Sequence, residues 1–500
     1  MDPGRFRYLN RSAILIVALA SLGIVSRTSS AYVTVYGGPT YTPGVGGYTS
    51  YAYGSYPIGD GFASFTANKY SATGANLGTR AVRMTTDGAP AMELGTLGTS
   101  STGVTSCYAY GGNAGAFTVG RAQQYGATGT NMGFRAVRWA PDRTAAQLED
   151  LVPAATGSLL QASSANAIDG AGNVVGYSAK LGVGGADLGY RAVRWDAGGT
   201  AVTELEPLST RPDGYAYATA RVINAAGTII GVSDRYDASG VELGTRAARW
   251  ASASAMPTEL PSPWTSDTGH VSSSAISING SGVTVGWAYK ETGPAWGYRG
   301  VRWSADGSTA TELGYLNTSN TGETWCIPRM VNEAGVTVGY AGDYTPTPGG
   351  GPSTRAVRWS ADSATPVVLQ HPESPGFDTL AYAINSSGTS VGYYQNFTPG
   401  SGGTIARAFA WDDSGAWTDL NTLIDPASGW VILKYAFAIS DSNWVSGVGN
   451  FDPDGPGPRG AYERTFLLQV PEPAVLGAAI CIAGTISLTR RARRRAVGRV

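Results

Sequence analysis

The segment Arg191-Ala192-Val193-Arg194-Trp195 recurs eight times along the chain in this or a related form. The copies begin at Arg80, Arg135, Arg191, Arg246, Arg299, Arg355, Arg407 and Arg464. Consecutive copies lie 52 to 57 residues apart. A fixed period of about 50 residues is typical of an array of small supersecondary units, because each unit buries its apolar side only against a neighbour. The sequence therefore predicts one large repeat domain.

Three other short signals accompany this segment in each unit. They are a Thr-Glu-Leu type segment such as Thr203-Glu204-Leu205, an Ile-Asn pair such as Ile223-Asn224, and an apolar residue followed by Gly, such as Ile230-Gly231. The Asn and this Gly are seven residues apart, which indicates a tight reverse turn between two strands. All four segments are rich in Val, Ile, Thr and aromatic residues and are bounded by turn residues. Four such strands in about 55 residues predict the blade of a β-propeller.

The number of repeat units predicts the number of blades. Residues 33–84 are a degenerate first copy, because Tyr51-Ala52-Tyr53-Gly54 echoes Tyr108-Ala109-Tyr110-Gly111. The units span 33–84, 90–139, 145–195, 202–250, 257–303, 310–359, 366–411 and 418–468. We therefore expect an all-β propeller of eight units within residues 32–469. Seven blades are the alternative, if the first copy instead completes the last blade and closes the ring.

The second Arg of the recurring segment keeps a spacing of ten residues from a following Glu. The pairs are Arg83 with Glu93, Arg194 with Glu204, Arg249 with Glu259, and Arg302 with Glu312. We expect them to form charge-assisted hydrogen bonds across the hairpin, between stacked blades. A ligand clamp is the less favoured alternative, because ligand sites seldom repeat in every blade.

The Trp that closes the segment predicts core packing between blades. It recurs as Trp139, Trp195, Trp250, Trp303, Trp359 and Trp411. Met84 and Leu468 replace it in the outermost copies, so side-chain bulk is the expected requirement. Stacking on a sugar is the alternative.

Both ends of the chain carry export signals. Arg5, Arg7 and Arg11 precede the apolar residues 13–25, and small residues follow, which predicts a signal peptide over 1–31 with cleavage between Ala31 and Tyr32. The apolar run is too short for a permanent membrane span.

At the other end, Pro471-Glu472-Pro473 precedes an apolar stretch over 474–488 and a cluster of arginines. An apolar segment followed by arginines enters a membrane with the arginines in the cytoplasm. Residues 470–500 resemble the PEP-CTERM sorting signal of Gram-negative bacteria. The resemblance implies a transient membrane helix, recognition by a membrane transpeptidase of the exosortase type, and delivery to the cell surface or extracellular matrix.

The repeats resemble the bacterial extracellular HAF-repeat family. Residues 223–231, 278–286 and 384–392 match its Ile-Asn-x-x-Gly-x-Val-Gly turn, and Arg407-Ala408-Phe409-Ala410-Trp411 is similar to its His-Ala-Phe-x-Trp strand. Arg stands in place of the His, so no role of that His is carried over. The resemblance implies the fold and an extracellular location rather than an activity.

Charge and cysteine content exclude several functions. Between the two end segments the chain holds 25 basic and 35 acidic residues, so a basic nucleic-acid footprint is absent. Cys107 and Cys326 occupy equivalent places four units apart, on opposite sides of a ring of eight. That separation excludes a disulfide, and we expect buried free thiols.

The search for chemistry yields no catalytic, cofactor-binding or metal-binding residue. The two histidines, His270 and His371, lack Cys or acidic neighbours at metal spacing. Acidic residues outside the repeat pattern are Asp60, Glu149, Asp150, Glu291, Glu323, Asp343 and Glu463. The sequence leaves open whether two of them approach as a glycosidase pair would. Loop tyrosines Tyr70, Tyr125 and Tyr236 suit adaptable contacts or, preferably, capping of strands.

Two functions remain. The first is a secreted, surface-sorted structural or binding module of the cell envelope or matrix, with a polysaccharide or envelope protein as partner. The alternative is a carbohydrate-active propeller enzyme, a glycoside hydrolase or lyase, acting on exopolysaccharide.

Overall fold

The computed structural model describes the repeat domain strand by strand. The described residues are 35–37, 41–42, 46–51, 58–59, 61–151, 162–251, 256–264, 269–291, 293–345, 352–370, 378–397, 404–452 and 460–471. The expected signal peptide and the residues after Pro471 lie outside them. Within the described residues, no helix has the length and apolar character needed to cross a membrane.

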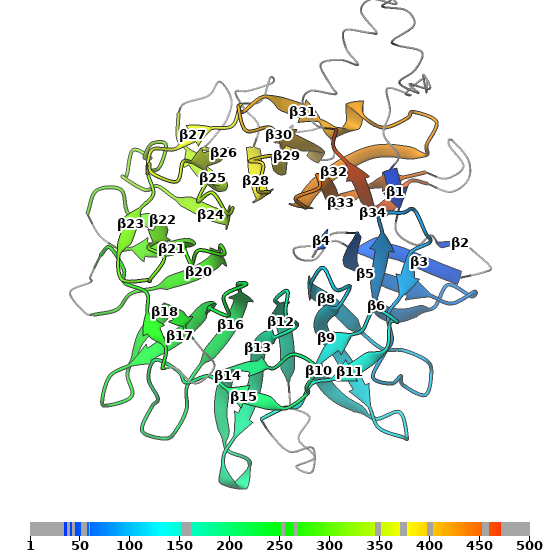
Figure 1. Ribbon diagram of the computed structural model, residues 1–500, viewed down its shortest axis with the longest axis horizontal. Coiled ribbons are helices and arrows are strands. Elements are labelled where there is room, and N and C mark those ends of the chain that lie inside the picture. The colour runs from blue at the N-terminus through cyan, green and yellow to red at the C-terminus, as the bar shows by residue number, and fades with distance from the viewer. Residues whose placement is uncertain are drawn as a thin grey trace, which may run out of the picture.

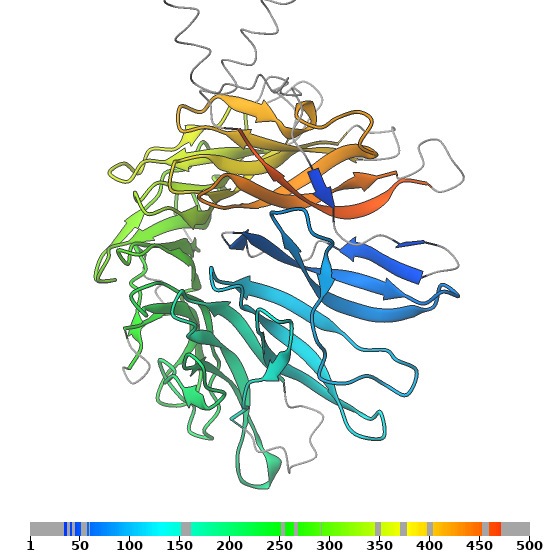
Figure 2. The same cartoon turned by 45° about the vertical axis from the view of Figure 1, so that its right-hand side comes forward.

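Eight β-sheets form a ring, seen along its axis in Figure 1 and from an oblique direction in Figure 2. We number the sheets as blades 1 to 8 along the chain. The prediction of an all-β propeller with eight blades is confirmed. Besides strands, the described residues contain two short 3-10 helices, η2 (Val183–Gly185) and η3 (Leu420–Thr422).

Blades 2 to 7 each contain four antiparallel strands, ordered from the axis outward as in the sequence. Blade 2 is β8 (Cys107–Gly112), β9 (Thr118–Tyr125), β10 (Asn131–Trp139) and β11 (Ala145–Gln147). Blade 3 is β12 (Ser163–Ile168), β13 (Val174–Leu181), β14 (Asp187–Trp195) and β15 (Val202–Glu204). Blade 4 is β16 (Ala218–Ile223), β17 (Ile229–Tyr236), β18 (Glu242–Trp250) and β19 (Thr258–Glu259). Blade 5 is β20 (Ser273–Ile278), β21 (Thr284–Lys290), β22 (Gly297–Trp303) and β23 (Ala310–Glu312). Blade 6 is β24 (Cys326–Val331), β25 (Thr337–Asp343), β26 (Ser353–Trp359) and β27 (Val367–Val368). Blade 7 is β28 (Asp378–Ile384), β29 (Ser390–Phe397), β30 (Thr404–Trp411) and β31 (Trp417–Asp419).

Blades 1 and 8 share the N-terminal segment. Blade 1 contains β2 (Tyr41–Thr42), β3 (Gly46–Tyr51), β4 (Ile58–Gly59), β5 (Phe62–Tyr70), β6 (Asn76–Thr85) and β7 (Met92–Glu93). Blade 8 contains β32 (Trp430–Ile439), β33 (Trp444–Phe451), β34 (Tyr462–Gln469) and, on its outer edge, β1 (Val35–Gly37). The N-terminal residues therefore close the ring by completing the last blade, as the seven-blade alternative supposed. They do so in a ring of eight, because residues 41–93 still form a blade of their own.

A blade is offset by one strand from the repeat unit seen in the sequence. The Glu-containing strand pairs with the Arg strand that precedes it, as in Val193 opposite Glu204. It is therefore the outermost strand of that blade, whereas the sequence units begin with it. Each sequence unit thus spans two blades.

Apolar side chains fill the space between neighbouring blades. The buried apolar residues described here form eight clusters, and each cluster joins two adjacent blades. In the cluster between blades 3 and 4, for example, Leu205 follows the outer strand of blade 3, and Trp250 comes from blade 4. All six repeat Trp side chains are 0% exposed, which confirms their predicted place in the core between blades.

The Trp side chains also have a polar role that the sequence interpretation missed. Each indole N–H donates to a main-chain carbonyl of the preceding blade. The residue that provides this carbonyl lies two positions after the outer-strand Glu of that blade, or after the residue that replaces the Glu. Trp139 donates to Gly95 O at 2.7 Å and Trp303 to Pro261 O at 2.8 Å. Bulk is therefore not the only requirement at this position.

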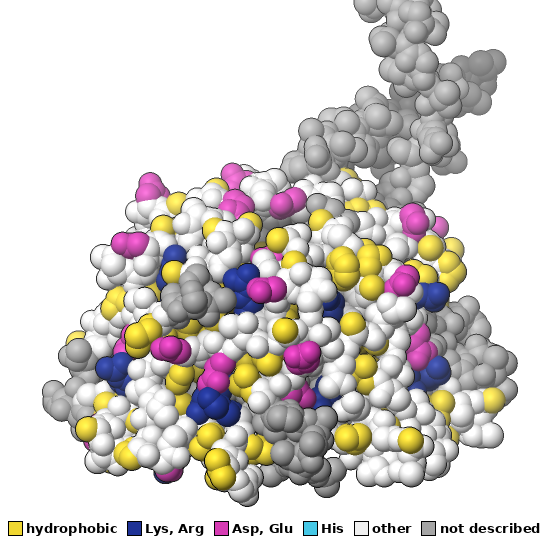
Figure 3. All heavy atoms as spheres, turned by 60° about the horizontal axis from the view of Figure 1, so that its bottom comes forward, with side chains coloured by type: hydrophobic (Ala, Val, Ile, Leu, Met, Phe, Trp, Pro, Cys, Tyr) yellow, Lys and Arg dark blue, Asp and Glu magenta, His cyan; other side chains and the backbone are white. Residues whose placement is uncertain are grey.

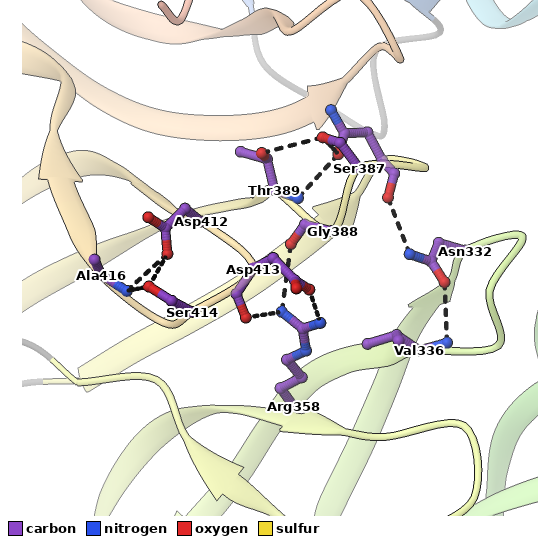
Figure 4. A network of polar contacts seen from close by, with 11 residues as sticks. Asn332, Val336, Arg358, Ser387, Gly388, Thr389, Asp412, Asp413, Ser414 and Ala416 are labelled. Atoms are coloured by element: carbon purple, nitrogen blue, oxygen red, sulfur yellow. Dashed lines mark hydrogen bonds and ion pairs between the residues drawn. The ribbon is translucent and has the colours of Figure 1, made fainter. Parts of the chain in front are cut away.

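The repeat Asn residues link the blades at a second level. The side-chain amide of each donates to the main-chain carbonyl of the equivalent residue in the next blade. Asn224 donates to Asn279 O, Asn279 to Asn332 O, and Asn332 to Asn385 O, at 2.9 to 3.0 Å. The Asn332 side-chain oxygen accepts from Val336 N and holds its own turn (Figure 4). One side chain thus orders a turn and joins two blades.

Removal of β1 tests the closure of the ring. Compared with a chain that begins at Tyr32, a chain that begins at residue 38 loses three residue pairs with β34 and exposes that strand as an open edge. We expect its free energy of unfolding to fall by about 1–4 kcal/mol and its self-association to increase. Urea denaturation and analytical ultracentrifugation measure the two effects. A chain that begins at Val35 is the control and should match the longer chain. Equal stability of the chain that begins at residue 38 would contradict this closure.

Candidate functional site

A β-bulge interrupts the innermost strand of every blade from 2 to 8. In β8, Ala109 pairs with Gly120 and Gly111 pairs with Val119, so Tyr110 is the extra residue. Bulges redirect the side chain of the extra residue and recur at functional positions. The extra residues at equivalent positions are Tyr110, Asn166, Arg221, Ile276, Arg329, Tyr382 and Phe437. Strand β32 of blade 8 has two further register shifts, before the one at Phe437.

The recurring Gly of the second strand is required by this bulge. A Cβ on Gly231 would collide with the main-chain oxygen of Thr219 in the inner strand, and one on Gly286 with that of Ser274. The same collision occurs at the equivalent Gly of the other bulged blades. The Gly was interpreted as the end of a turn pattern, but its larger role is to admit the bulge.

The bulged residues surround the axis, because the inner strands are the innermost elements of the ring (Figure 1). Several reach the inner strand of the next blade. Asn166 donates to Ala220 O at 2.8 Å, Arg221 donates to the Ser274 hydroxyl, and the Tyr382 and Phe437 rings lie 5.4 Å apart. These side chains are half-buried or, for Arg221, exposed. Each of these side chains is therefore partly exposed to solvent, although the blades on either side of it are closely packed.

Aromatic rings extend this belt onto neighbouring strands. Tyr108 stacks on Tyr110 at a centroid distance of 6.4 Å, whereas Tyr340 and Tyr393 lie 6.3 and 5.7 Å from Tyr382. Tyr435 lies 5.8 Å from Phe437. We call the seven bulged residues, with Tyr108, Arg121, Tyr340, Tyr393 and Tyr435, the axial lining.

Three phenols of the axial lining, those of Tyr110, Tyr340 and Tyr393, have raised pKa values and remain protonated at neutral pH. Burial raises the pKa of Tyr110, although nearby Arg121 opposes the shift. Burial likewise raises the pKa of Tyr340, against the effect of Arg329, and burial with the neighbouring Tyr382 raises that of Tyr393. These tyrosines therefore offer neutral hydroxyl groups beside apolar ring faces. Sites for small ligands combine apolar surface with a few polar groups in this way.

The repeat arginines, in contrast, are part of the frame. The first Arg of the segment, not the second, binds the following Glu: the Arg80 Nε to Glu93 Oε1 distance is 2.9 Å, and that from Arg246 Nε to Glu259 Oε1 is 3.0 Å. Arg191 with Glu204 and Arg299 with Glu312 repeat this contact. The predicted pairing of Arg83 with Glu93, Arg194 with Glu204, Arg249 with Glu259 and Arg302 with Glu312 is therefore wrong.

The register explains the error. Val82 lies opposite Glu93, so strand alternation places Glu93 on the face of Arg80 and leaves Arg83 on the other face. The constant spacing of ten from the second Arg is equally a constant spacing of thirteen from the first.

The second Arg usually joins its blade to the next one. Arg83 donates to Pro141 O at 3.1 Å, and Arg302 donates to Ser360 O at 2.7 Å. In Figure 4, Arg358 of blade 6 binds Gly388 and Asp413 of blade 7. Arg194 differs, because it binds Asp196 and Asn173 of its own blade. The second arginines therefore contact the next blade in most cases, and their partners there are mostly main-chain oxygens in place of the predicted Glu.

The acidic residues outside the repeat are held by separate partners. Asp150 binds Arg135 and Ser163, and Glu463 binds Lys434. Although burial alone raises the pKa of Asp343, its hydrogen bonds, including one from Arg355, lower it to about 2. Asp60 lies outside the described residues.

The histidines and cysteines have modest roles. His270 Nδ1 lies 3.1 Å from Glu291 Oε1, an acidic neighbour that the sequence spacing did not reveal, and His371 lies outside the described residues. Among the described residues, no group of three His, Cys, Asp or Glu side chains could hold a metal ion. Cys107 and Cys326 are buried and free, as predicted. Burial raises their pKa values to about 12 and about 11.

The loop tyrosines favour the capping interpretation. Tyr125 donates to Gln123 at 3.1 Å, and buried Tyr236 donates to Asp234 at 3.2 Å. Both side chains hold the end of their own strand.

Comparison with known proteins adds little to the site. No protein-family profile and no curated protein matches the chain. Among solved structures, it is similar to an uncomplexed acylaminoacyl peptidase of Pyrococcus horikoshii, with TM-score 0.40, 10% identity, and coverage of 83% of this chain and 61% of the peptidase. It is also similar to a structure from a study of two prolyl endopeptidases, with TM-score 0.47, 9% identity, and coverage of 88% of this chain and 56% of that protein. A third similar structure is the phage phi92 endosialidase, with TM-score 0.33, 12% identity, and coverage of 90% of this chain and 72% of the endosialidase. The chain thus spans about three fifths of the two peptidases, and these likenesses carry no functional argument.

The corrected ion pair gives a test of the frame. Glu312→Gln leaves Arg299, whose side chain is 1% exposed, without its carboxylate. We expect the free energy of unfolding to fall by roughly 1–3 kcal/mol, because an unpaired buried cation is costly. Water that reaches the half-exposed position of the carboxylate compensates for the lost ion pair only in part. Glu463→Gln, which breaks the more exposed pair with Lys434, is the control and should change stability by less than about 1 kcal/mol. Guanidinium denaturation compares them. Equal, small effects would show that the Arg299 pair is not a structural contact.

Proposed function

We propose that this protein is an exported binding module that holds a glycan on its axial lining. The chain is a β-propeller module, and the observation that supports a binding role is the contrast between its two sets of positions. The residues between blades repeat from one blade to the next, whereas the bulged residues change from Tyr to Asn, Arg, Ile and Phe. A uniform frame that presents variable side chains is the usual arrangement of a binding surface.

A glycan fits the chemistry of these side chains. Aromatic rings such as Tyr108, Tyr110 and Tyr382 supply apolar surface for contact with the apolar side of a sugar ring. Asn166 and the neutral phenols supply hydrogen-bonding groups for hydroxyls. We place binding ahead of cleavage of exopolysaccharide, because Asp150, Asp343 and Glu463 are held by cationic partners that support the frame.

Export and sorting form the second part of the proposal. The leader-like residues 1–31 and the Pro471-Glu472-Pro473 tail resemble segments that direct a protein to the surface or matrix of a Gram-negative-type bacterium. An exosortase-type transpeptidase would act on that tail, and the chain would be anchored in the membrane only transiently.

Loss of aromatic rings tests the binding site. Tyr382→Ala and Tyr110→Ala should each weaken binding to a polysaccharide ligand, found on a panel of immobilised bacterial and algal polysaccharides, by about 10-fold, since each removes roughly 1–2 kcal/mol of ring contact. Trp417→Ala is the control, because Trp417 is 42% exposed and lies on an outermost strand. Isothermal titration calorimetry gives the affinities, and an assay for reducing ends detects cleavage. Unchanged affinity of both tyrosine variants would refute the site, and release of reducing ends would favour the enzyme.

Substitution within the tail tests sorting. Glu472→Ala should leave the protein in the membrane fraction as a longer form, because the transpeptidase would no longer recognise its motif. Cell fractionation and mass measurement of the C-terminus provide the readout. Glu463→Ala, a substitution close to the tail but in strand β34, is the control. Processing of Glu472→Ala like that of the unaltered chain would remove the sorting proposal.

A further inference from the structure

Three arginines of the axial lining differ from the first arginine of the repeat segment. Arg121 lies on the second strand of blade 2, and Arg221 and Arg329 are the bulged residues of blades 4 and 6. In a ring of eight they come from every second blade, roughly a quarter-turn apart. Within the part of the chain that the structure describes, no carboxylate forms an ion pair with them. Each repeat arginine of the first type from Arg80 to Arg407 has such a partner.

Aromatic rings and hydroxyls position these guanidinium groups without neutralising them. The Arg121 guanidinium lies 4.6 Å from the centre of the Phe134 ring and 5.1 Å from that of Tyr108. The Arg329 guanidinium lies 5.1 Å from the centre of the Tyr382 ring. Cation–π contact fixes the plane of an arginine and leaves its edge N–H groups free to donate. Among the described residues, the Arg121 Nε has no hydrogen-bond partner.

Although the Arg221 side chain is exposed overall, the protein that surrounds its base removes part of its hydration and lowers its pKa. Asp234, a carboxylate near Tyr217, is buried and is bound by the hydroxyls of Tyr236 and Thr245. On the molecular face drawn in Figure 3, acidic and basic side chains are interspersed. An unpaired, partly desolvated arginine is costly unless a ligand supplies the counter-charge.

We infer that the axial ligand is an acidic glycan, a polyuronate whose carboxylates are bound by Arg121, Arg221 and Arg329. This inference rests on the proposed glycan-binding function and specifies its ligand class. The planar guanidinium matches a carboxylate through two parallel hydrogen bonds, and the adjacent Tyr rings contact the sugar that bears it. Three arginines spaced around the axis favour a polymer with repeated carboxylates over a single small anion.

Matched polymers separate the inference from the proposed function. Binding of the full mature chain is measured by calorimetry with polygalacturonate, with alginate, and with carboxyl-reduced polygalacturonate, which keeps the sugar rings and removes the charge. We expect the acidic polymers to bind at least 10-fold more tightly than the reduced one, and added NaCl to narrow the difference. Free galacturonate should compete poorly with the polymer.

Single substitutions identify the arginines responsible. Arg121→Gln, Arg221→Gln and Arg329→Gln should each weaken polyuronate binding by about 10-fold or more and weaken binding of the reduced polymer by a much smaller factor. Arg211→Gln is the matched control, because the Arg211 guanidinium also lies over a tyrosine ring, Tyr215 at 5.4 Å, but is paired with Asp213 away from the axis. Thermal unfolding verifies that every variant is folded.

Each outcome decides between the two proposals. Equal affinity for acidic and reduced polymers, with no effect of the arginine substitutions, overturns the polyuronate inference and leaves glycan binding intact. Competition by free galacturonate as strong as by the polymer replaces the polymer with a small anion and also overturns the inference. Failure of all these polymers to bind, together with no binder on a wider polysaccharide panel, overturns both.

Discussion

The packing of one blade against the next is the contact on which the whole molecule depends. A four-stranded sheet cannot bury its two faces by itself, and here each face is covered only by a neighbouring sheet. The apolar clusters between blades remove that surface from water, and the Trp and Asn side chains satisfy main-chain carbonyls at the same boundaries. Because every blade needs two neighbours, the ring must close, and pairing of β1 with β34 closes it.

This dependence divides the residues into two groups with different constraints. Residues at the boundaries between blades must repeat, since each meets an equivalent surface. The residue in the bulge of an inner strand meets solvent on one side, so its identity is free to vary. The Gly opposite the bulge has no Cβ, which lets the main chain of the bulged strand approach closely. Variation without loss of the frame is the physical basis for placing binding at the axis.

The sequence predicted more of the frame than of the site. The period, the turn residues and the Trp positions were sufficient for an eight-bladed propeller with Trp between blades. The Glu strand was assigned to the blade that follows it, although it is the outermost strand of the blade that precedes it. Sequence order alone does not show that the Glu strand pairs with the preceding Arg strand. The same ambiguity assigned Glu93 to Arg83 instead of Arg80. A period-two count from Val82 would have favoured Arg80.

The bulged residues were missed for a different reason. A bulge adds one residue without a distinctive residue type, so Tyr110 or Arg221 does not stand out within its strand. The available signal was the Gly in the following strand of every unit, where a side chain would otherwise be expected. Such a Gly indicates a close approach of another backbone. The ion pairs of Asp150 and Asp343 depended on distances between strands that no spacing reveals.

Hydrogen–deuterium exchange of the mature protein with and without an oligogalacturonate tests the central claim that the axis binds the ligand. The account predicts added protection in peptides that contain the inner strands β8, β16, β24 and β28, and unchanged exchange in the outermost strands. Protection confined to the outermost strands and the outer turns would contradict it.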